Sequence, residues 1–197
     1  MHRNSVMFSS HTTLEGWQLT AARFGWLLVT AMILVLFILA VPSDYAQQYQ
    51  SASSEFSAAL AELGLSPVFL AAYRTAMNLL LAVAFIAAGI FIFLRKSDDW
   101  MVMLVSLTCS AFVVLFVPTL VRLMDAQPAY TLPVAFVRAF GLGASLIVFY
   151  YLFPDGRLVP GWLKPFMFVW IGMVVMWCAF PDAPFNLVFL YTWYNNL

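Results

Sequence analysis

The stretch Tyr150-Tyr-Leu-Phe-Pro-Asp-Gly-Arg-Leu-Val-Pro-Gly-Trp162 is a short polar turn between two long apolar segments. Its centre, Pro154-Asp155-Gly156, has the composition of a β-turn, because proline fixes φ, aspartate bonds its own backbone and glycine accepts a positive φ. Arg157 and Lys164 place positive charge beside the turn. A turn of this kind belongs at a membrane surface, and its charge indicates which surface.

The composition excludes an ordinary soluble domain. The chain has 197 residues, of which 64% are hydrophobic and only 9% are charged, whereas soluble domains carry about 25% charged residues. We therefore expect an all-α, polytopic integral membrane bundle whose immediate partner is the lipid bilayer. The formal net charge of zero gives no basis for nucleic-acid binding.

Apolar runs predict about five membrane helices and divide the chain into three parts. Residues 1–23 form a cytoplasmic arm with an interfacial segment, residues 24–180 the membrane domain, and residues 181–197 an apolar outer tail too short to span a bilayer as a helix. The predicted membrane helices are Phe24–Val41, Pro67–Leu94, Trp100–Val121, Thr131–Phe153 and Trp162–Phe180.

The first of these helices allows two interpretations, a cleaved signal peptide or a retained span. Its apolar run, Phe24–Val41, is 18 residues long, beyond the usual ~7–15 residues of a signal-peptide core. No Ala-x-Ala site lies directly after it, so we expect a retained helix that ends at Pro42. Trp26 is expected at headgroup depth.

Residues 43–66 form the longest polar stretch and contain no Lys or Arg. Ser54 is a suitable N-cap and Gly64 a suitable stop for a short helix lying on the membrane surface. The apolar stripe of this helix consists of Phe56, Leu60 and Leu63. Two interpretations stay open, a ligand-sensing outer loop and a plain connector.

Basic residues predict the orientation. With the N-terminus in the cytoplasm, the outer segments hold only Arg122, apart from two arginines inside helices. Such an excess on one side is the positive-inside pattern. The residues of the inner segments are Arg3, Arg23, Arg95, Lys96, Arg157 and Lys164.

The chain has no catalytic or cofactor motif that we can identify, so no enzyme activity, cofactor or metal is expected. His2 and His11 lie in the polar arm, which argues against a membrane cytochrome, and all Asp and Glu residues fall in the arm or in loops. Proton and ion relays usually place acids inside the membrane. Cys109 and Cys178 lie in apolar runs, where a thiol usually packs as a small hydrophobe rather than forming a disulfide.

Arg74 and Arg138 are the candidate ligand residues, because each lies about two turns inside a predicted helix near the outer leaflet. An intramembrane arginine is a functional-site hypothesis by default. Facing one cavity, the two would bind an anionic ligand. The alternative is that each snorkels to the headgroups or pairs with a carboxylate. The carboxylates within reach are Asp125, Glu62 and Asp44.

Small residues mark close helix packing, either within the chain or in a homodimer. They lie in the second and fourth predicted helices: Ala84, Ala87, Ala88, Gly89, Gly141, Gly143, Ala144 and Ser145.

Several ordered stretches together resemble the N-terminal membrane region of Chloroflexi-type bacterial sensor histidine kinases. They are Leu94–Leu107, Leu132–Gly143, Phe149–Trp162 with the turn motif Phe153-Pro154-Asp155-Gly156-Arg157, and Phe180–Asn186. The resemblance implies a multi-pass protein of the bacterial inner, or cytoplasmic, membrane. In that family a phosphoacceptor histidine and an ATP-binding domain follow, and residues 1–197 contain neither, so the resemblance extends only to the input role.

We therefore expect a membrane input module of a bacterial signal-transduction protein, with helix shifts felt at turns 95–99 and 153–164. The alternative is a non-catalytic integral subunit that packs in a larger membrane complex. A transporter is a third and more distant reading, since no internal repeat is evident.

Overall fold

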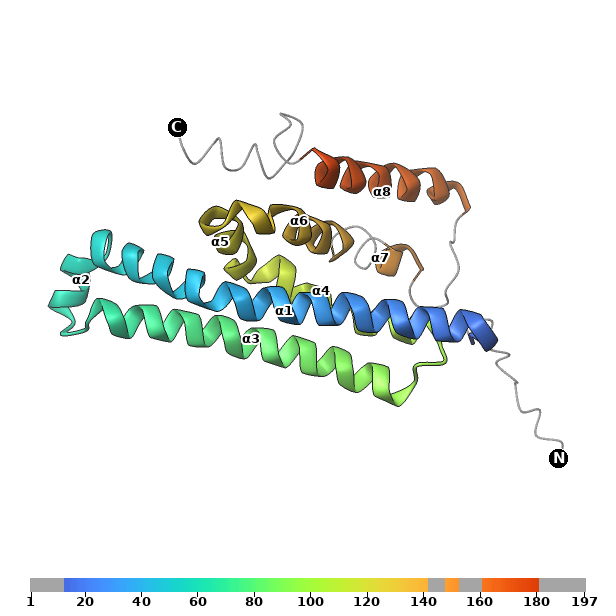
Figure 1. The fold of residues 1–197 in the computed structure, drawn as a ribbon, viewed down its shortest axis with the longest axis horizontal. Helices are drawn as coiled ribbons and strands as arrows, with labels where there is room; N and C mark the ends of the chain where they lie inside the picture. The colour runs from blue at the N-terminus through green and yellow to red at the C-terminus, as the bar shows by residue number, and fades with distance from the viewer. Residues whose placement is uncertain (1–12, 142–147, 153–160, 181–197) are drawn as a thin grey trace.

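The computed structural model describes residues 13–141, 148–152 and 161–180, and every regular element in these ranges is helical. Two long antiparallel helices, α1 (Gly16–Ser54) and α3 (Pro67–Arg95), lie side by side and are joined at one end by the short helix α2 (Ser57–Glu62) (Figure 1). We call this end of the bundle the α2 end. The opposite end carries the turn between α3 and α4, and we call it the turn end.

Helix α1 differs from the prediction at both of its ends. It begins at Gly16, so residues expected in the arm belong to the helix, and it continues through Pro42 to Ser54. The prediction that Pro42 ends the helix is wrong. Pro42 is exposed, while buried residues continue on one face at Phe37, Ala40, Asp44, Gln48 and Ala52. Packing of this face outweighs the one backbone hydrogen bond that proline removes.

The short helix expected within 43–66 is present as α2. Gly64 adopts a φ of +67°, and the Leu65 amide donates to the Leu60 carbonyl at 2.9 Å, so the predicted glycine stop is confirmed. Ser54 does not cap this helix, because it is the last residue of α1 and its hydroxyl donates to Gln50 O.

Helix α3 begins at Pro67 as predicted and ends at Arg95, one residue beyond the expected end. The Ser66 side chain accepts a hydrogen bond from the Phe69 amide at 3.1 Å, and proline occupies the first turn, where it removes no helical hydrogen bond. Local sequence signals therefore determine where this helix begins.

The third predicted helix is broken. Helix α4 (Trp100–Phe116) is capped by Asp99, whose carboxylate accepts from the Met101 and Val102 amides. A second helix, α5 (Thr119–Ala126), follows Pro118, and the segments Trp100–Val114 and Thr119–Ala126 form an angle of 55°. Pro118 has no N–H to donate, and here the helix ends before it, so the expectation of one continuous helix over Trp100–Val121 is wrong.

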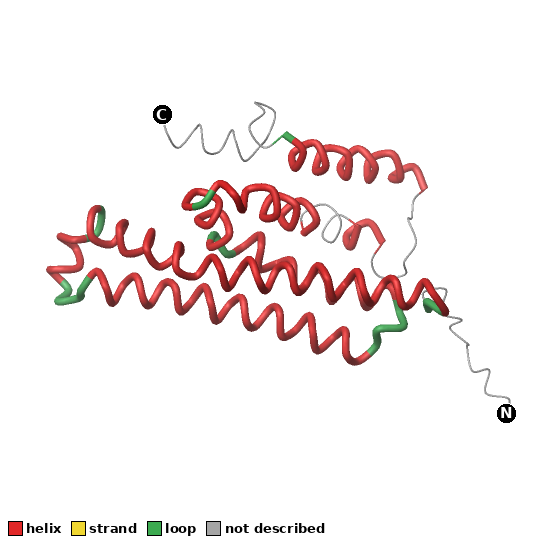
Figure 2. The backbone as a smooth tube through the Cα atoms, viewed as in Figure 1, coloured by secondary structure: helices red, strands yellow, loops and turns green. Residues whose placement is uncertain are grey.

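The remaining helices form further layers on α1. The 3₁₀ turn η1 (Pro128–Tyr130) leads into α6 (Thr131–Ala139), which packs on α4, on α1 and on α5. Helix α8 (Lys164–Ala179) follows the turn η3 (Gly161–Leu163) and packs against α6 on the side away from α1 (Figures 1 and 2). The fourth predicted helix is described only as α6 and α7 (Val148–Leu152).

Two helices of the described ranges, α1 and α3, are long and apolar enough to cross a membrane, and α4 with α5 makes a third if the bent pair is one span. The chain is therefore a membrane-embedded helical protein. With 39 residues, α1 extends about 58 Å, well beyond a hydrocarbon core of about 30 Å.

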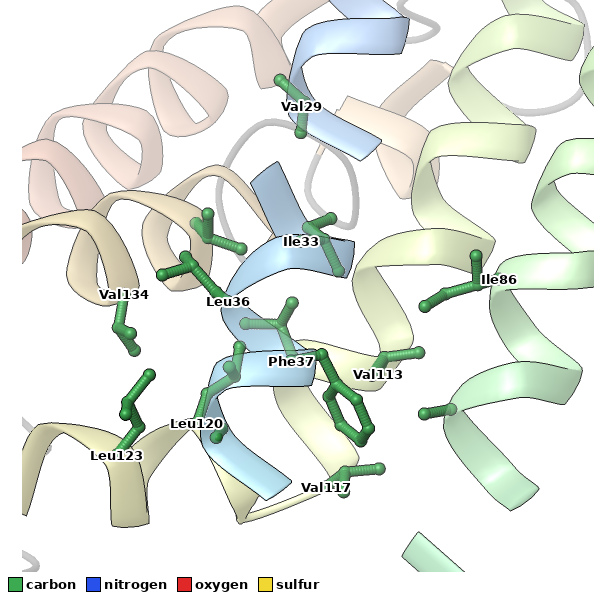
Figure 3. Close-up of a cluster of buried hydrophobic side chains, with 14 residues drawn as sticks. Val29, Ile33, Leu36, Phe37, Ile86, Val113, Val117, Leu120, Leu123 and Val134 are labelled. Carbon is green, nitrogen blue, oxygen red and sulfur yellow. The ribbon is translucent and has the colours of Figure 1, made fainter. Parts of the chain in front are cut away.

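An apolar core fills the middle of the bundle. Side chains of α1, α3, α4, α5 and α6 meet there, with Ile33 and Phe37 of α1 near Val113 of α4 and Val117, which follows α4 (Figure 3). Toward the α2 end this core gives way to charged and amide side chains.

Candidate functional site

The most unusual feature of the bundle is a buried ion pair between α1 and α5. The Arg122 guanidinium donates through Nη1 to the Asp44 carboxylate, which is fully buried. Asp44 lies on the packed face of α1, and Arg122 lies one turn after Thr119, a buried residue at the start of α5. The pair thus joins the part of the bundle that follows the Pro118 break directly to the longest helix.

Amide side chains form hydrogen bonds with both members of the ion pair, and one of these amides, Asn78, belongs to α3. Asn78 of α3 donates from Nδ2 to the second carboxylate oxygen of Asp44 at 3.3 Å. The Gln48 amide, oriented with its oxygen toward Arg122, accepts from Nη1 and from Nη2, the latter at 3.0 Å. Gln47 donates to the Arg122 carbonyl at 3.4 Å. We call Asp44, Gln48, Asn78 and Arg122 the polar clamp.

The side chains of the polar clamp stabilise one another, because its charges are buried. Removing two charges from water costs several kcal/mol for each ion, and mutual attraction offsets this only with good geometry and satisfied hydrogen bonds. Two buried hydroxyls one turn away, on Thr75 and Thr119, have no hydrogen-bond partner among the described residues. The polar groups at the α2 end are therefore only partly satisfied in this arrangement.

A second polar contact joins three helices toward the turn end. The Trp26 indole donates to Ser106 Oγ at 2.9 Å, and Ser106 in turn donates to the Gly89 carbonyl at 2.6 Å. The Trp26 ring stacks on Phe93, with centroids 3.9 Å apart. Trp26 is thus buried between helices.

The spacing of the two contacts matches a bilayer. Trp26 and Asp44 are 18 positions apart on one helix, which corresponds to about 27 Å along its axis. A hydrocarbon core is about 30 Å thick. The polar clamp and the Trp26–Ser106 contact are therefore separated along α1 by about the thickness of a hydrocarbon core.

At the turn end, the residues just before α1 form backbone hydrogen bonds with the α3–α4 turn. The Leu14 amide donates to the Asp98 carbonyl at 2.7 Å, and Thr13 forms an isolated β-bridge with Asp99. Arg23 donates from Nε to the Ser97 carbonyl at 3.5 Å. This end of the bundle is closed mainly by backbone groups.

The two predicted ligand arginines lie in different places. Arg74, on α3 at the α2 end, is half-buried and lies over the Phe56 ring at 5.0 Å from its centroid. Arg138 lies at the end of α6, on the other side of α1, and α3 and α6 share no extensive interface. The structure does not bring the two arginines into one cavity.

The sequence offers three carboxylates as alternative ion-pair partners of Arg74 and Arg138. Asp44, one of the three carboxylates, pairs with Arg122 instead, and no ion pair joins Arg74 or Arg138 to a carboxylate within the described ranges. The turn motif Phe153-Pro154-Asp155-Gly156-Arg157 and the tail 181–197 lie outside the described residues.

Sequence reasoning missed the polar clamp because Asp44 was assigned to a loop. The signal was nonetheless present: Asp44, Gln47 and Gln48 follow the i, i+3, i+4 spacing of one helix face. Once α1 is continued through Pro42, that face is the packed one, and an acid there requires a buried partner.

In the described parts of the chain, no group of three or more His, Cys, Asp or Glu residues could hold a metal ion. Comparisons with known proteins add no family: no family model matches the chain, and no curated protein or solved structure matches it significantly.

Proposed function

We propose that this chain is the membrane input module of a bacterial signal-transduction protein, and that the polar clamp is where the input changes the helix arrangement. The sequence resemblance to the membrane region of sensor histidine kinases supports this function. The observation that carries the proposal is the buried Asp44–Arg122 ion pair, which holds the broken α4–α5 segment against α1 and α3.

A buried ion pair with amide partners favours two separate helix arrangements over a continuous range of them. A small displacement of either helix would leave charges unpaired in a low-dielectric site, so intermediate positions are disfavoured. Helix α5 is short and follows a proline break, so it is able to move as a unit relative to α4. The unpaired hydroxyls of Thr75 and Thr119 are groups that a second arrangement would satisfy.

The proposed topology has five spans, with the N-terminus and the α3–α4 turn in the cytoplasm of a bacterial inner membrane. The basic residues Arg23, Arg95 and Lys96 at the turn end support this orientation. The α2 end is then outside. A cysteine at Leu63, which is 72% exposed, would react with an impermeant maleimide in intact cells, whereas one at Leu94 would not.

The test of the function uses the protein extracted in mild detergent from its own membranes. We expect a domain with a phosphoacceptor histidine and an ATP-binding site, on the same polypeptide or on a tightly bound partner. Arg122→Gln should change its basal autophosphorylation, and Arg95→Gln, an exposed arginine at the other end, should not. Recovery of a stoichiometric membrane complex without any kinase would contradict the proposal.

The second candidate function is a non-catalytic subunit of such a membrane complex. Helix α8 favours it, because only Met167 and Val174 are buried among its described side chains, while Phe168 is 64% exposed. The same purification distinguishes the two functions, since a subunit would bring its complex with it.

A further inference from the structure

Arg74 is the cation at the α2 end that the polar clamp leaves unused. Within the described ranges the ion pairs are Asp44–Arg122 and Lys96–Asp99, so no described carboxylate neutralises Arg74. Its neighbour across the helix pair is an aromatic ring, Phe56, with the guanidinium carbon 5.0 Å from the ring centroid. A ring under the flat face of a guanidinium stabilises the cation and leaves the N–H donors at its edge free.

The depth of Arg74 follows from the antiparallel packing of α1 and α3. Asn78 contacts Asp44, so a position four residues earlier on α3 lies about 6 Å farther toward the α2 end, level with Gln48. Tyr49 and Tyr73, 42% and 52% exposed, lie at the same level. Tyrosines concentrate at headgroup depth, so Arg74 lies at the depth of lipid phosphates.

Apolar surface continues directly from Arg74 along α3. Met77 and Leu81 follow Arg74 by three and seven positions on the same face of α3, toward the middle of the helix, and each is 44% exposed. A dissolved anion gains nothing from such a surface, whereas the glycerol and acyl chains of a lipid pack on it. The guanidinium edge matches a phosphate, which accepts two parallel hydrogen bonds from it.

We propose that Arg74 and Phe56 form a binding site for the phosphate of an anionic phospholipid in the leaflet at the α2 end. Phe56 immediately precedes α2, and Asn78 of the polar clamp lies one turn from Arg74, so a bound headgroup fastens the outer loop to α3 beside the clamp. Placement in the outer leaflet and a regulatory role for this lipid rest on the proposed function; the binding itself does not.

The test measures lipid contact at one position of the full chain. Met77→Cys, in a background with Cys109→Ser and Cys178→Ser, carries a fluorophore, and the protein is reconstituted in phosphatidylcholine vesicles. A headgroup nitroxide quencher is attached either to phosphatidylglycerol or to phosphatidylcholine at equal mole fraction. We expect the phosphatidylglycerol quencher to be preferred about fivefold near Met77, as one basic residue near an anionic headgroup predicts.

Matched variants separate this site from general attraction to anionic lipid. Arg74→Gln should abolish the preference at Met77, Arg74→Lys should keep part of it, and Phe56→Ala should weaken it. Arg95 lies over the Phe91 ring at 4.9 Å, the same kind of contact at the other end of α3. Arg95→Gln should therefore leave the preference at Met77 unchanged and lower it at a label on Leu94→Cys.

Three outcomes would overturn the proposal. One is equal quenching by the two lipids near Met77, and another is a preference that survives Arg74→Gln in protein of unchanged helix content. The third is loss of the preference in millimolar inorganic phosphate, which would assign the site to a dissolved anion. No kinase takes part in this experiment, so its failure leaves the proposed function standing, and failure of the kinase test leaves the lipid site standing.

Discussion

The two ends of the α1–α3 helix pair are joined to their neighbours by different chemistry. At the α2 end, one ion pair and two amides connect α1, α3 and α5. At the turn end, backbone hydrogen bonds, a stacked ring pair and a serine bound to a glycine carbonyl connect α1, α3 and α4. The first arrangement depends on a few charges, whereas the second spreads its stability over many close contacts.

The largest expected loss of stability follows removal of the Arg122 cation at the α2 end. Arg122→Gln leaves the Asp44 carboxylate buried without its partner, and breaking a buried pair in this way costs about 3–5 kcal/mol. The free energy of unfolding by SDS titration in bicelles measures it. Arg74→Gln is the matched control, because this arginine at the same end lies over a ring and forms no ion pair within the described ranges, so its loss should cost about 1 kcal/mol or less.

Close packing near the turn end predicts a smaller but clear effect. A Cβ on Gly89 would clash with Ser110 Oγ and meet the Ser106 carbonyl at 2.8 Å. Gly89→Ala should therefore destabilise the bundle by about 1–3 kcal/mol in the same assay. Gly25→Ala, where nothing lies within 4 Å, should instead stabilise by about 0.5–1 kcal/mol. Equal effects of the two alanines would contradict close contact between α3 and α4.

The hydrogen bond between Trp26 and Ser106, also near the turn end, can be tested by substitution. Ser106→Ala removes the acceptor of the Trp26 indole and should cost about 1–2 kcal/mol, because the buried donor is left unpaired. In a Trp26→Phe background the same substitution should cost less, since the donor is already gone. If the serine substitution costs the same in both backgrounds, the indole hydrogen bond contributes nothing.

The smallest expected effect lies at the exposed side of the turn end. Asp99→Ala removes the cap of α4 and should cost about 1 kcal/mol. Lys96→Gln removes only the ion pair to Asp99, whose nitrogen–oxygen distance is 3.6 Å, and should cost less than about 0.5 kcal/mol, because the lysine is exposed. A larger cost for the lysine than for the aspartate would reverse the assignment of Asp99 as a cap.

The bounds of α3 and the glycine stop after α2 were predictable from the sequence, since Ser66, Pro67 and Gly64 act locally. The course of α1 was not, because the packed face beyond Pro42 becomes evident only when α5 is placed against it. The polar clamp was missed for the same reason: the partner of Asp44 is 78 positions away and follows a helix break. Local signals determined helix ends, whereas the site depends on tertiary contacts.

The most direct test of the account is a double-mutant cycle on Asp44 and Arg122 in lipid. Unfolding free energies are measured for the unsubstituted chain, Asp44→Asn, Arg122→Gln and the double variant. The account predicts that the double variant is more stable than the sum of the single effects by about 2 kcal/mol, because the two charges are needed only for each other. Additive effects, within about 0.5 kcal/mol, would contradict the claim that this pair holds α5 to α1.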